Sequence, residues 1–451
     1  MIRWLRSWLD SRRQPRWRRQ VQAAFHGGRP SEAIRPLRRL AALHDAAALF
    51  QLGSCYANGL GVIRNLPESL VWMRWAAERD HPEACWSLAR ILLHGPGNQH
   101  DGANPLRWYG TETSAEDDAG APAPDTAGET TNRDLFFPAG TGVATDPAEG
   151  LRWLLRAAEL EHPLALVQLA QRAATGDGIP RDDAKVLDYL ARALATDHPE
   201  AHFANGRLHH EGTLVPRDAA KAIEHFQSAA ERGHIQAMFE LAYIRLGDPP
   251  PIHDVDEARR WLEKAAAGNH VMALTLLANL LHADADDASH RRAAYLLRKA
   301  AQSNHPRATL ALGTLYEHGH GVERDPFEAV HWHRKAAERG STVAQFRLGL
   351  LYGQGTGVIR NFQTAAQWFE MAARQGHWEA RVNLGLFHWR GNLGAVDLPR
   401  ALMWVGLALE TVPDDKKDEI VRLRDSLAAE MTAEQQAEST RLASEWSGQA
   451  A

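Results

Sequence analysis

The sequence has few cysteines and lacks any long hydrophobic run. Cys55 and Cys85 are its two cysteines, a number that excludes a disulfide-stapled scaffold and a four-cysteine zinc site. Both lie among apolar residues with helical spacing, where we expect buried, unreactive thiols. Because no run of about 18 apolar residues occurs, the sequence predicts no transmembrane helix. Arginines interrupt residues 1–25, so we expect no secretory signal and a cytoplasmic location.

Charge is nearly balanced over the whole chain but is unevenly distributed along it. The 451 residues contain 51 Lys and Arg against 56 Asp and Glu, a net charge of −5. Residues 1–40 contain eleven Arg but only Asp10 and Glu32, so this segment carries +9 and the remainder −14. A basic N-terminal segment therefore precedes an acidic main part. The hydrophobic fraction of 44% is too high for a wholly disordered protein.

The sequence repeats itself with a period close to 36 residues. One copy shows the full set of repeated residues: Ala344, Leu348, Gly349, Tyr352, Gly355, Gly357 and Val358. The positions equivalent to Leu348, which we call the reference positions, are Leu52, Leu88, Leu169, Asn205, Leu241, Leu277, Leu312 and Leu384. Their spacing is 35 or 36 residues except for one interval of 81, which contains an insertion of 45 residues. The spacing predicts nine units between residues 45 and 412.

Each unit is predicted to contain two helices. Small and apolar residues recur around the reference position at helical spacing. The second helix should begin after a residue that can cap it, and these residues are Asn65, Asp146, Asp182, Asp218, Asp254, Ser289, Asp325, Asn361 and Asp397. Further on, a Trp such as Trp332 and a double Ala such as Ala336-Ala337 recur. One hairpin cannot bury its apolar faces alone, so we predict an all-α, right-handed α–α superhelix with helical end caps.

The loop between the two helices carries a second signature. Gly59-x-Gly61-Val62 and Gly355-x-Gly357-Val358 are two of its copies. Together with the cap residue, the Trp and the double Ala, this pattern resembles Sel-1-like repeats, which are similar to tetratricopeptide repeats but have a longer loop. The units of Asn205, Leu241 and Leu277 depart from the loop pattern. The resemblance implies that the first helices line a concave side and that the protein binds other proteins.

The segments outside the repeats are predicted to differ in character. Residues 1–20 should form a basic amphipathic segment, residues 21–44 a divergent leading hairpin, and residues 413–451 two capping helices. Within the second unit, residues 98–139 hold eight acids against two Arg and few apolar residues. We expect this insertion to be disordered. Its short apolar stretches either pack back onto the repeats or dock a partner.

No motif predicts a catalytic, metal or cofactor site. Seven histidines share one repeat position and are interpreted as structural turn residues: His81, His162, His198, His234, His270, His305 and His377. The pairs His318 with His320 and His331 with His333 lack a recognisable third ligand. The loop glycines recur after helices, without the preceding strand that a phosphate-binding loop needs. We therefore expect a protein that is not an enzyme, the alternative being an enzyme whose site cannot be recognised from sequence.

The N-terminal segment has three interpretations. Ile2, Leu5 and Leu9 lie on one side of a short helix, which Pro15 is expected to end. This helix could cap the repeats, or it could attach the protein to an anionic membrane through residues 1–19 at the inner face of the membrane. Binding of nucleic acid is the least favoured interpretation, because no nucleic-acid-binding module accompanies the arginines.

The residues left over from packing form the candidate binding surface. The residues one position before the reference residue and two and six positions after it (−1, +2 and +6) lie on one stripe of the first helix. We call this stripe the binding stripe. Its candidate residues are Gln51, Ser54, Ser87, Arg90, Gln168, Gln171, Arg207, Glu211, Arg347, Gln354, Asn383 and Arg390. Because the stripe differs from unit to unit, we predict a regulatory, bacterial adaptor whose groove binds proteins or peptides. A membrane-peripheral regulator is the alternative.

Overall fold

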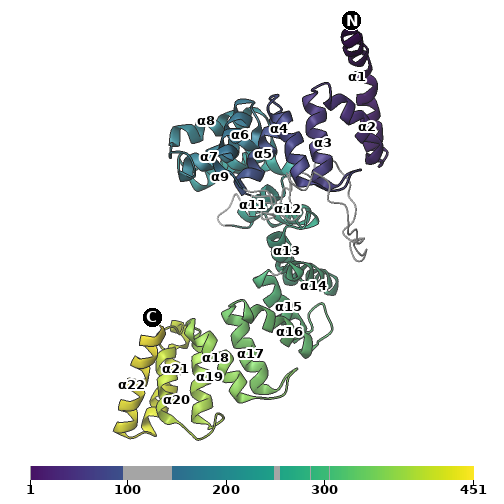
Figure 1. The fold of residues 1–451 in the computed structure, drawn as a ribbon. Coiled ribbons are helices and arrows are strands. Elements are labelled where there is room, and N and C mark those ends of the chain that lie inside the picture. The colour runs from purple at the N-terminus through teal and green to yellow at the C-terminus, as the bar shows by residue number, and fades with distance from the viewer. Residues whose placement is uncertain (1, 95–144, 248–253, 285, 304, 451) are drawn as a thin grey trace, which may run out of the picture. The chain divides into compact units, whose positions relative to one another are not determined.

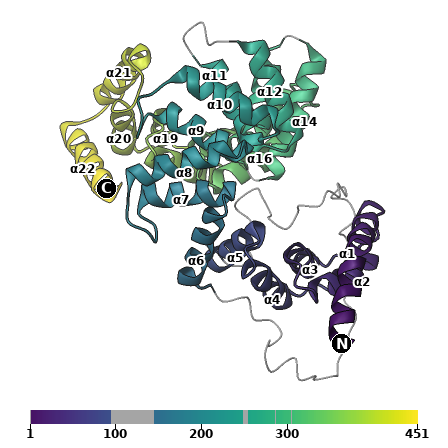
Figure 2. The same cartoon turned by 90° about the horizontal axis from the view of Figure 1, so that it is seen from above.

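The computed structural model describes residues 2–94, 145–247, 254–284, 286–303 and 305–450. Within these ranges the chain forms twenty-two helices and no strand, so the expected all-α fold is confirmed. The chain divides into two compact units, Met1–His234 and Ile235–Ala451, and each is described by itself (Figures 1 and 2). The predicted disordered insertion, residues 98–139, lies outside the described residues.

Helices in both units form consecutive antiparallel hairpins. The first unit contains α1 (Ile2–His26), α2 (Pro30–Ala41), α3 (Ala46–Asn58), α4 (Leu66–Ala77), α5 (Pro82–His94), α6 (Pro147–Glu159), α7 (Pro163–Thr175), α8 (Asp183–Ala195), α9 (Pro199–Glu211) and α10 (Ala219–Glu231). The second unit contains α11 (Ile235–Leu246), α12 (Val255–Ala267), α13 (Val271–Ala283), α14 (Asp287–Gln302), α15 (Pro306–His318), α16 (Pro326–Glu338), α17 (Thr342–Gln354), α18 (Phe362–Arg374), α19 (Trp378–Trp389), α20 (Leu398–Ala408), α21 (Asp414–Ala429) and α22 (Ala433–Ala450). From α3 to α20, odd-numbered helices are the first helices of the repeats and even-numbered ones the second.

Eight of the nine predicted cap residues cap their helices. Asn361, for example, accepts a hydrogen bond from the backbone N–H of Thr364 at 3.0 Å. The backbone N–H of each cap residue also donates to a carbonyl in the last turns of the first helix, as from Asn361 to Tyr352 at 2.9 Å. The prediction for Ser289 is wrong: α14 begins earlier and is capped by Asp286, which accepts from the N–H of Ser289 at 2.9 Å. The shortened loop of this unit leaves room for the longer helix.

The repeated histidines cap the first helices. The ring Nδ1 atoms of His81, His162, His198, His270, His305 and His377 accept hydrogen bonds from backbone N–H groups of the first turn. An Nδ1 that accepts carries no proton, so these rings are neutral with the proton on Nε2. The structure therefore confirms the predicted structural role of these residues and identifies it as helix capping.

Histidines at this repeat position also join successive repeats. Phe203 stacks on His234 with ring centroids 4.4 Å apart, and Phe346 stacks on His377 at 4.5 Å. Similar pairs are Phe50 with His81, Trp86 with His162, and Phe239 with His270. In every pair the aromatic residue stands two before the reference position of one repeat and the histidine begins the next. The cap residue therefore also covers the side of the preceding first helix.

Small residues in the first helices allow close contact with the second helices. A β-carbon added at Gly206 would lie 2.6 Å from the ring of Phe226, and one at Gly313 would lie 2.8 Å from the ring of His333. Gly349 faces Phe369 in the same way. Where the residue after the reference position is Ala rather than Gly, the buried partner is Leu: Leu154, Leu190, Leu262 or Leu297. In these repeats Ala is thus paired with a smaller buried side chain than the Phe that faces Gly206 or Gly349, in keeping with close packing.

The two ends of the chain adapt the repeat pattern. Ala33, Leu37, Leu40 and Ala41 of α2 are buried at the spacing of the packing residues of a second helix. α1 and α2 lie side by side in both views (Figures 1 and 2). The expectation that Pro15 ends the first helix is wrong, since α1 runs from Ile2 to His26. Burial of residues beyond Pro15 against the leading hairpin stabilises the helix despite the hydrogen bond that proline cannot donate.

The C-terminal helices are close to those predicted. Thr432 and Gln435 form the expected capping box: the Thr432 N–H donates to Gln435 Oε1 at 3.0 Å, and the Gln435 N–H donates to Thr432 Oγ1 at 3.3 Å. Trp446 of α22 packs edge-on against Trp404 of α20, with ring centroids 4.6 Å apart. The apolar face predicted for this helix therefore contacts the last second helix of the repeats.

The histidine caps make stability depend on pH. Burial lowers the pKa of His81, His198, His270, His305 and His377 below the ordinary value of 6.5. The unfolded chain therefore binds more protons than the folded chain as the pH falls through 6.5, and the free energy of unfolding should decrease there. Urea unfolding at a series of pH values measures this. In His270→Ser, which keeps a cap as Ser341 does in α17, the decrease should be smaller; equal pH slopes would contradict the assignment.

The packing pairs predict a specific double-mutant cycle. Gly349→Ala forces the added β-carbon against the Phe369 ring, and such overpacking costs about 1–3 kcal/mol, partly offset by up to about 1 kcal/mol of better helix propensity. Phe369→Leu alone leaves a cavity. The double variant recreates the Ala–Leu pair of other repeats, so its free energy of unfolding should exceed the additive expectation by about 1 kcal/mol or more. Additive effects in urea unfolding would show that the two positions do not share one packing site.

Candidate functional site

The predicted binding residues lie on first helices of both units. Those on α3, α5, α7 and α9 belong to the first unit, and those on α17 and α19 to the second. Gln171, Arg207, Glu211, Gln354 and Arg390 are exposed. Ser87 is a correction to the prediction, because it is 1% exposed on α5, where residues 84–89 are all buried. Neighbouring parts of the protein enclose this stretch of α5 on all sides, so the Ser87 side chain is not accessible to a partner.

In the first unit, several stripe residues already bond to neighbours within the unit. Gln168 Nε2 lies 3.1 Å from His94 Nε2 and so links α7 to α5. Arg207 and Glu211 form an ion pair on α9 at 2.5 Å. Ser54 Oγ donates to the backbone oxygen of Phe50 within α3 at 3.0 Å. Arg90 and Gln51 are half-buried and also have interactions. This part of the stripe is polar and internally bonded.

The second unit combines charge with apolar side chains on the stripe. Arg347 Nη1 lies 3.5 Å from Glu317 Oε1, and Arg390 is exposed at the end of α19. Asn383 Nδ2 donates to the backbone oxygen of Glu379 at 2.8 Å. At the +2 positions Leu350 and Leu386 are half-buried. The stripe here thus presents guanidinium groups beside aliphatic side chains.

Two features of this unit were missed from the sequence. Tyr243 of α11 holds the same +2 position and is 60% exposed; its repeat register alone would have identified it. His333 is completely buried, and its Nε2 lies 3.2 Å from Glu317 Oε2. This hydrogen bond, aided by Arg347, lowers the pKa of Glu317. The signal for His333 was its position, because Met, Leu, Phe or Val occupies the same place in the other repeats.

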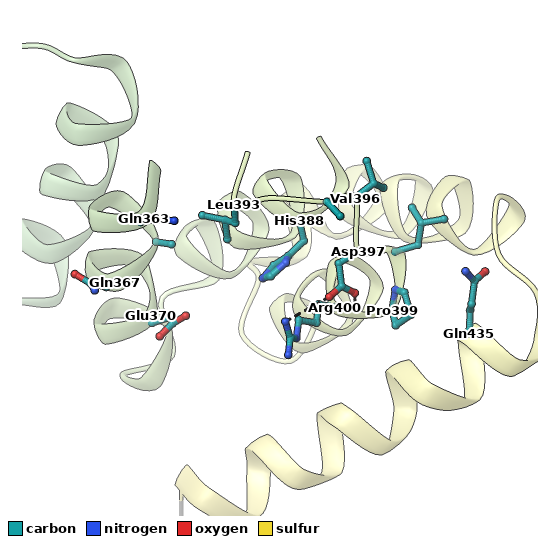
Figure 3. Close-up of a pocket in the computed structure, with 13 residues that line it drawn as sticks. Gln363, Gln367, Glu370, His388, Leu393, Val396, Asp397, Pro399, Arg400 and Gln435 are labelled. Carbon is teal, nitrogen blue, oxygen red and sulfur yellow. Dashed lines mark hydrogen bonds and ion pairs between the residues drawn. The ribbon is translucent and has the colours of Figure 1, made fainter. Parts of the chain in front are cut away.

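The second unit also contains a pocket of about 680 Å³ between α18, the loop before α20, and α20 (Figure 3). Glu370 and His388 line it, and burial raises the pKa of Glu370 and lowers that of His388. Arg400 and Asp397 face one another at 3.4 Å, and Asp397 also caps α20. The lining supplies acids and one imidazole but no Ser, Thr, Cys, Lys or Tyr side chain. The side chains that line the pocket therefore provide no hydroxyl, thiol or amine nucleophile.

In the part of the chain that the structure describes, the cysteines and the possible metal ligands provide no further site. Both cysteines are buried, and burial raises the pKa of Cys55 to about 12 and that of Cys85 to about 11, so neither forms a reactive thiolate at neutral pH. Within the described residues, no group of three His, Cys, Asp or Glu side chains is arranged to hold a metal ion. No helix among them is long and apolar enough to cross a membrane.

Comparison with known proteins agrees with this architecture. The family model of the Sel1 repeat matches residues 46–81, 139–162, 163–195, 199–234, 235–270, 271–305, 306–341, 342–377 and 378–410. Chitin synthase regulatory factor 3 of Schizosaccharomyces pombe is 32% identical over 131 residues, which cover 28% of this chain and 13% of that protein. The chain therefore spans only a small part of that relative.

Two solved structures are similar to this chain. The protective antigen c5321 of uropathogenic Escherichia coli, which displays an SLR fold, has a TM-score of 0.65 at 23% identity, over 96% of this chain and 84% of its own. A Sel1 repeat protein from Oxalobacter formigenes has a TM-score of 0.49 at 23% identity, over 78% of this chain and 90% of its own. With nine matched repeats over more than half of its length, this chain belongs to the Sel1 repeat family, a class of TPR-like helical repeats that generally act as protein-interaction scaffolds rather than enzymes.

Proposed function

We propose that this protein is a regulatory adaptor that binds a segment of a partner protein along the binding stripe of its first helices. One observation carries the proposal. Residues that pack the repeats recur from unit to unit, as do the fully buried Leu348 and Leu384. Their stripe neighbours Arg347 and Asn383 differ although they hold the same position. A surface that varies on a constant scaffold suits the recognition of a particular extended partner.

The second unit supports a more specific partner chemistry. Arg390 is exposed, and Arg347 keeps part of its guanidinium accessible, with the side chain 34% exposed. Leu350 and Leu386 on the same stripe contribute aliphatic surface. An extended segment that alternates acidic and apolar side chains would complement both features. We place this adaptor in the cytoplasm of a bacterium, and we propose neither catalysis nor binding of nucleic acid.

Charge reversal on the stripe tests the proposal. In the variant Arg347→Glu/Arg390→Glu, partner capture by the full-length protein should fall about tenfold or more, because like charges would then meet across the interface. Pull-down followed by quantification of the captured protein measures the loss. The melting temperature should change by no more than about 4 °C, as is usual for surface substitutions outside the core.

The matched control reverses two charges outside the repeats. Arg422→Glu/Arg441→Glu alters exposed residues of α21 and α22 and so changes the net charge by the same amount. Capture by this control should equal that of the unaltered protein. Equal loss in both variants, or no loss in either, would refute the stripe as the binding surface.

A second candidate function, attachment to the membrane, is favoured by the charge of the N-terminal helix. Trp17 and Val21 of α1 are buried, whereas Arg16, Arg18 and Arg19 are exposed. Exposed arginines on a helix attract anionic lipid, at about 1 kcal/mol for each basic residue near the surface. The basic balance of residues 1–40 supports this candidate.

Truncation of α1 separates this candidate from the adaptor function. Deletion of residues 2–13 removes Arg3, Arg6, Arg12 and Arg13 but retains the buried Trp17. Binding to phosphatidylserine vesicles, measured by sedimentation, should fall about tenfold or more at low salt. The unfolding transition should stay where it is. Unchanged vesicle binding would show that residues 2–13 do not attach the protein to the membrane.

A further inference from the structure

Three arginines on α2 line a pocket that contains no acidic side chain. Arg35, Arg38 and Arg39 are exposed along one face of the helix and border a cavity of about 510 Å³. The loop between α3 and α4 forms the opposite wall through Gly61. Figures 1 and 2 both show α2 next to α3. A concave surface with three positive charges and no countercharge in its lining is suited to an anion.

Contacts outside the pocket hold two of the guanidinium groups in place. Arg38 Nη2 donates to Tyr56 Oη at 2.7 Å. The Arg39 guanidinium carbon lies 5.5 Å from the ring centre of Trp17, which is buried. The nearby Glu32 pairs instead with Arg29, at 3.1 Å. In the described parts of the chain no carboxylate forms an ion pair with the three pocket arginines, so their charge stays available to a ligand.

The corresponding face of α12 shows that the repeat does not impose this charge. Counted from the N-cap residue of each helix, Arg35 and Arg38 correspond to Arg260 and Glu263. Glu263 and Glu257 border the shallow pocket of about 470 Å³ on that face. Both acids are paired with arginine, Glu263 with Arg292 at 3.0 Å and Glu257 with Arg245 at 2.8 Å. The face of α12 is thus balanced, whereas the face of α2 is not.

The loop wall is fixed by the backbone. Gly61 has φ +71°, and a β-carbon there would lie 2.5–2.6 Å from backbone atoms of Pro30 and Ser31. Only a residue without a side chain allows this contact. α2 also lacks the side-chain cap that the other second helices in the described ranges have. Its first-turn N–H groups therefore add partial positive charge near Ser31, at one end of the pocket.

We propose that this pocket binds a phosphate monoester. A guanidinium presents parallel N–H donors that match two phosphate oxygens. A phosphate monoester carries a charge of about −1.5 to −2 at neutral pH, which three arginines can compensate. The phosphate belongs either to a lipid headgroup or to a free small molecule. This site is independent of the binding stripe, since it lies on a second helix of the leading hairpin.

Calorimetry with a soluble probe tests the site in the full-length protein. Inositol 1,4,5-trisphosphate should bind, with inorganic phosphate as a weaker competitor. Arg35→Gln/Arg39→Gln should weaken binding of the trisphosphate about tenfold or more, because each lost charged hydrogen bond costs at least that factor. Arg35→Lys/Arg39→Lys, which keeps the charge but not the planar fork, should give an intermediate affinity. Circular dichroism melting should confirm that both variants are folded.

The matched control removes the same charge from the adjacent helix. Arg16→Gln/Arg19→Gln changes exposed residues of α1 and should leave the affinity for the trisphosphate within about twofold. Equal weakening by the control and the pocket variant would overturn the proposal, since a diffuse basic field would then explain binding. Absence of trisphosphate binding to the unaltered protein would also overturn it.

Vesicles distinguish the two sources of the phosphate. Phosphatidylcholine vesicles that contain phosphatidylinositol 4-phosphate are compared with vesicles of equal charge that contain phosphatidylserine, which has no phosphate monoester. Preference for the former, lost in Arg35→Gln/Arg39→Gln, would assign the site to a lipid headgroup. Trisphosphate binding without vesicle preference would assign it to a free phosphate. Both results support the site. They differ only in whether the bound phosphate belongs to a lipid headgroup or to a free small molecule.

Discussion

Close contact between the two helices of each repeat is the constraint on which the rest of the structure depends. The residue after the reference position must be Gly or Ala, because a large side chain of the second helix occupies the space beside it. Gly349 with Phe369 and Ala278 with Leu297 are two solutions of the same volume requirement. Once this contact is made, the first helix can expose only one stripe. The surface offered to a partner is therefore what the packing leaves over.

The joints between repeats depend on a second contact, made by the histidine at the start of most first helices. One ring nitrogen caps the helix, and the ring face covers an aromatic residue of the preceding repeat, as His377 covers Phe346. Where Ser341 replaces the histidine, Leu310 stands in the aromatic position. The cap and the stacked residue therefore vary together in that repeat. A single side chain satisfies backbone N–H groups and buries apolar surface at once.

Much of this architecture could be predicted because its signals are local and repeated. A period of about 36 residues, cap residues and loop glycines appear many times, so an error in one copy is corrected by the others. Ser289 was misassigned because its unit has a shortened loop, and Asp286 stands closer to the helix start. Pro15 was misread because helix propensity is local, whereas the burial of Trp17 and Val21 depends on α2. Features that occur only once in the chain were therefore the hardest to predict from the sequence.

The site was less predictable than the fold for the same reason. Repeat register correctly placed the stripe on the first helices, but it could not show that Ser87 is enclosed or that Glu317 links His333 to Arg347. These facts depend on which side chains from different helices meet. The arginines of α2 lie within the basic residues 1–40, yet only the position of Gly61 and the pairing of Glu32 distinguish a pocket from a charged surface.

One backbone contact has a consequence for how this chain can be altered. The N–H of Asp146 donates to the carbonyl of Leu92 at 3.0 Å, as the equivalent cap residues do in the repeats without an insertion. The two helices therefore close their hairpin in the same way, although Leu92 and Asp146 are 54 positions apart, whereas Tyr56 and Asn65 are nine apart.

 The difference between these two separations is the 45-residue insertion. The hairpin thus tolerates foreign chain at this point without a change in how its helices meet. The α5–α6 junction is accordingly a natural display position, where an epitope or a reporter domain could replace the inserted residues while the repeats keep their register.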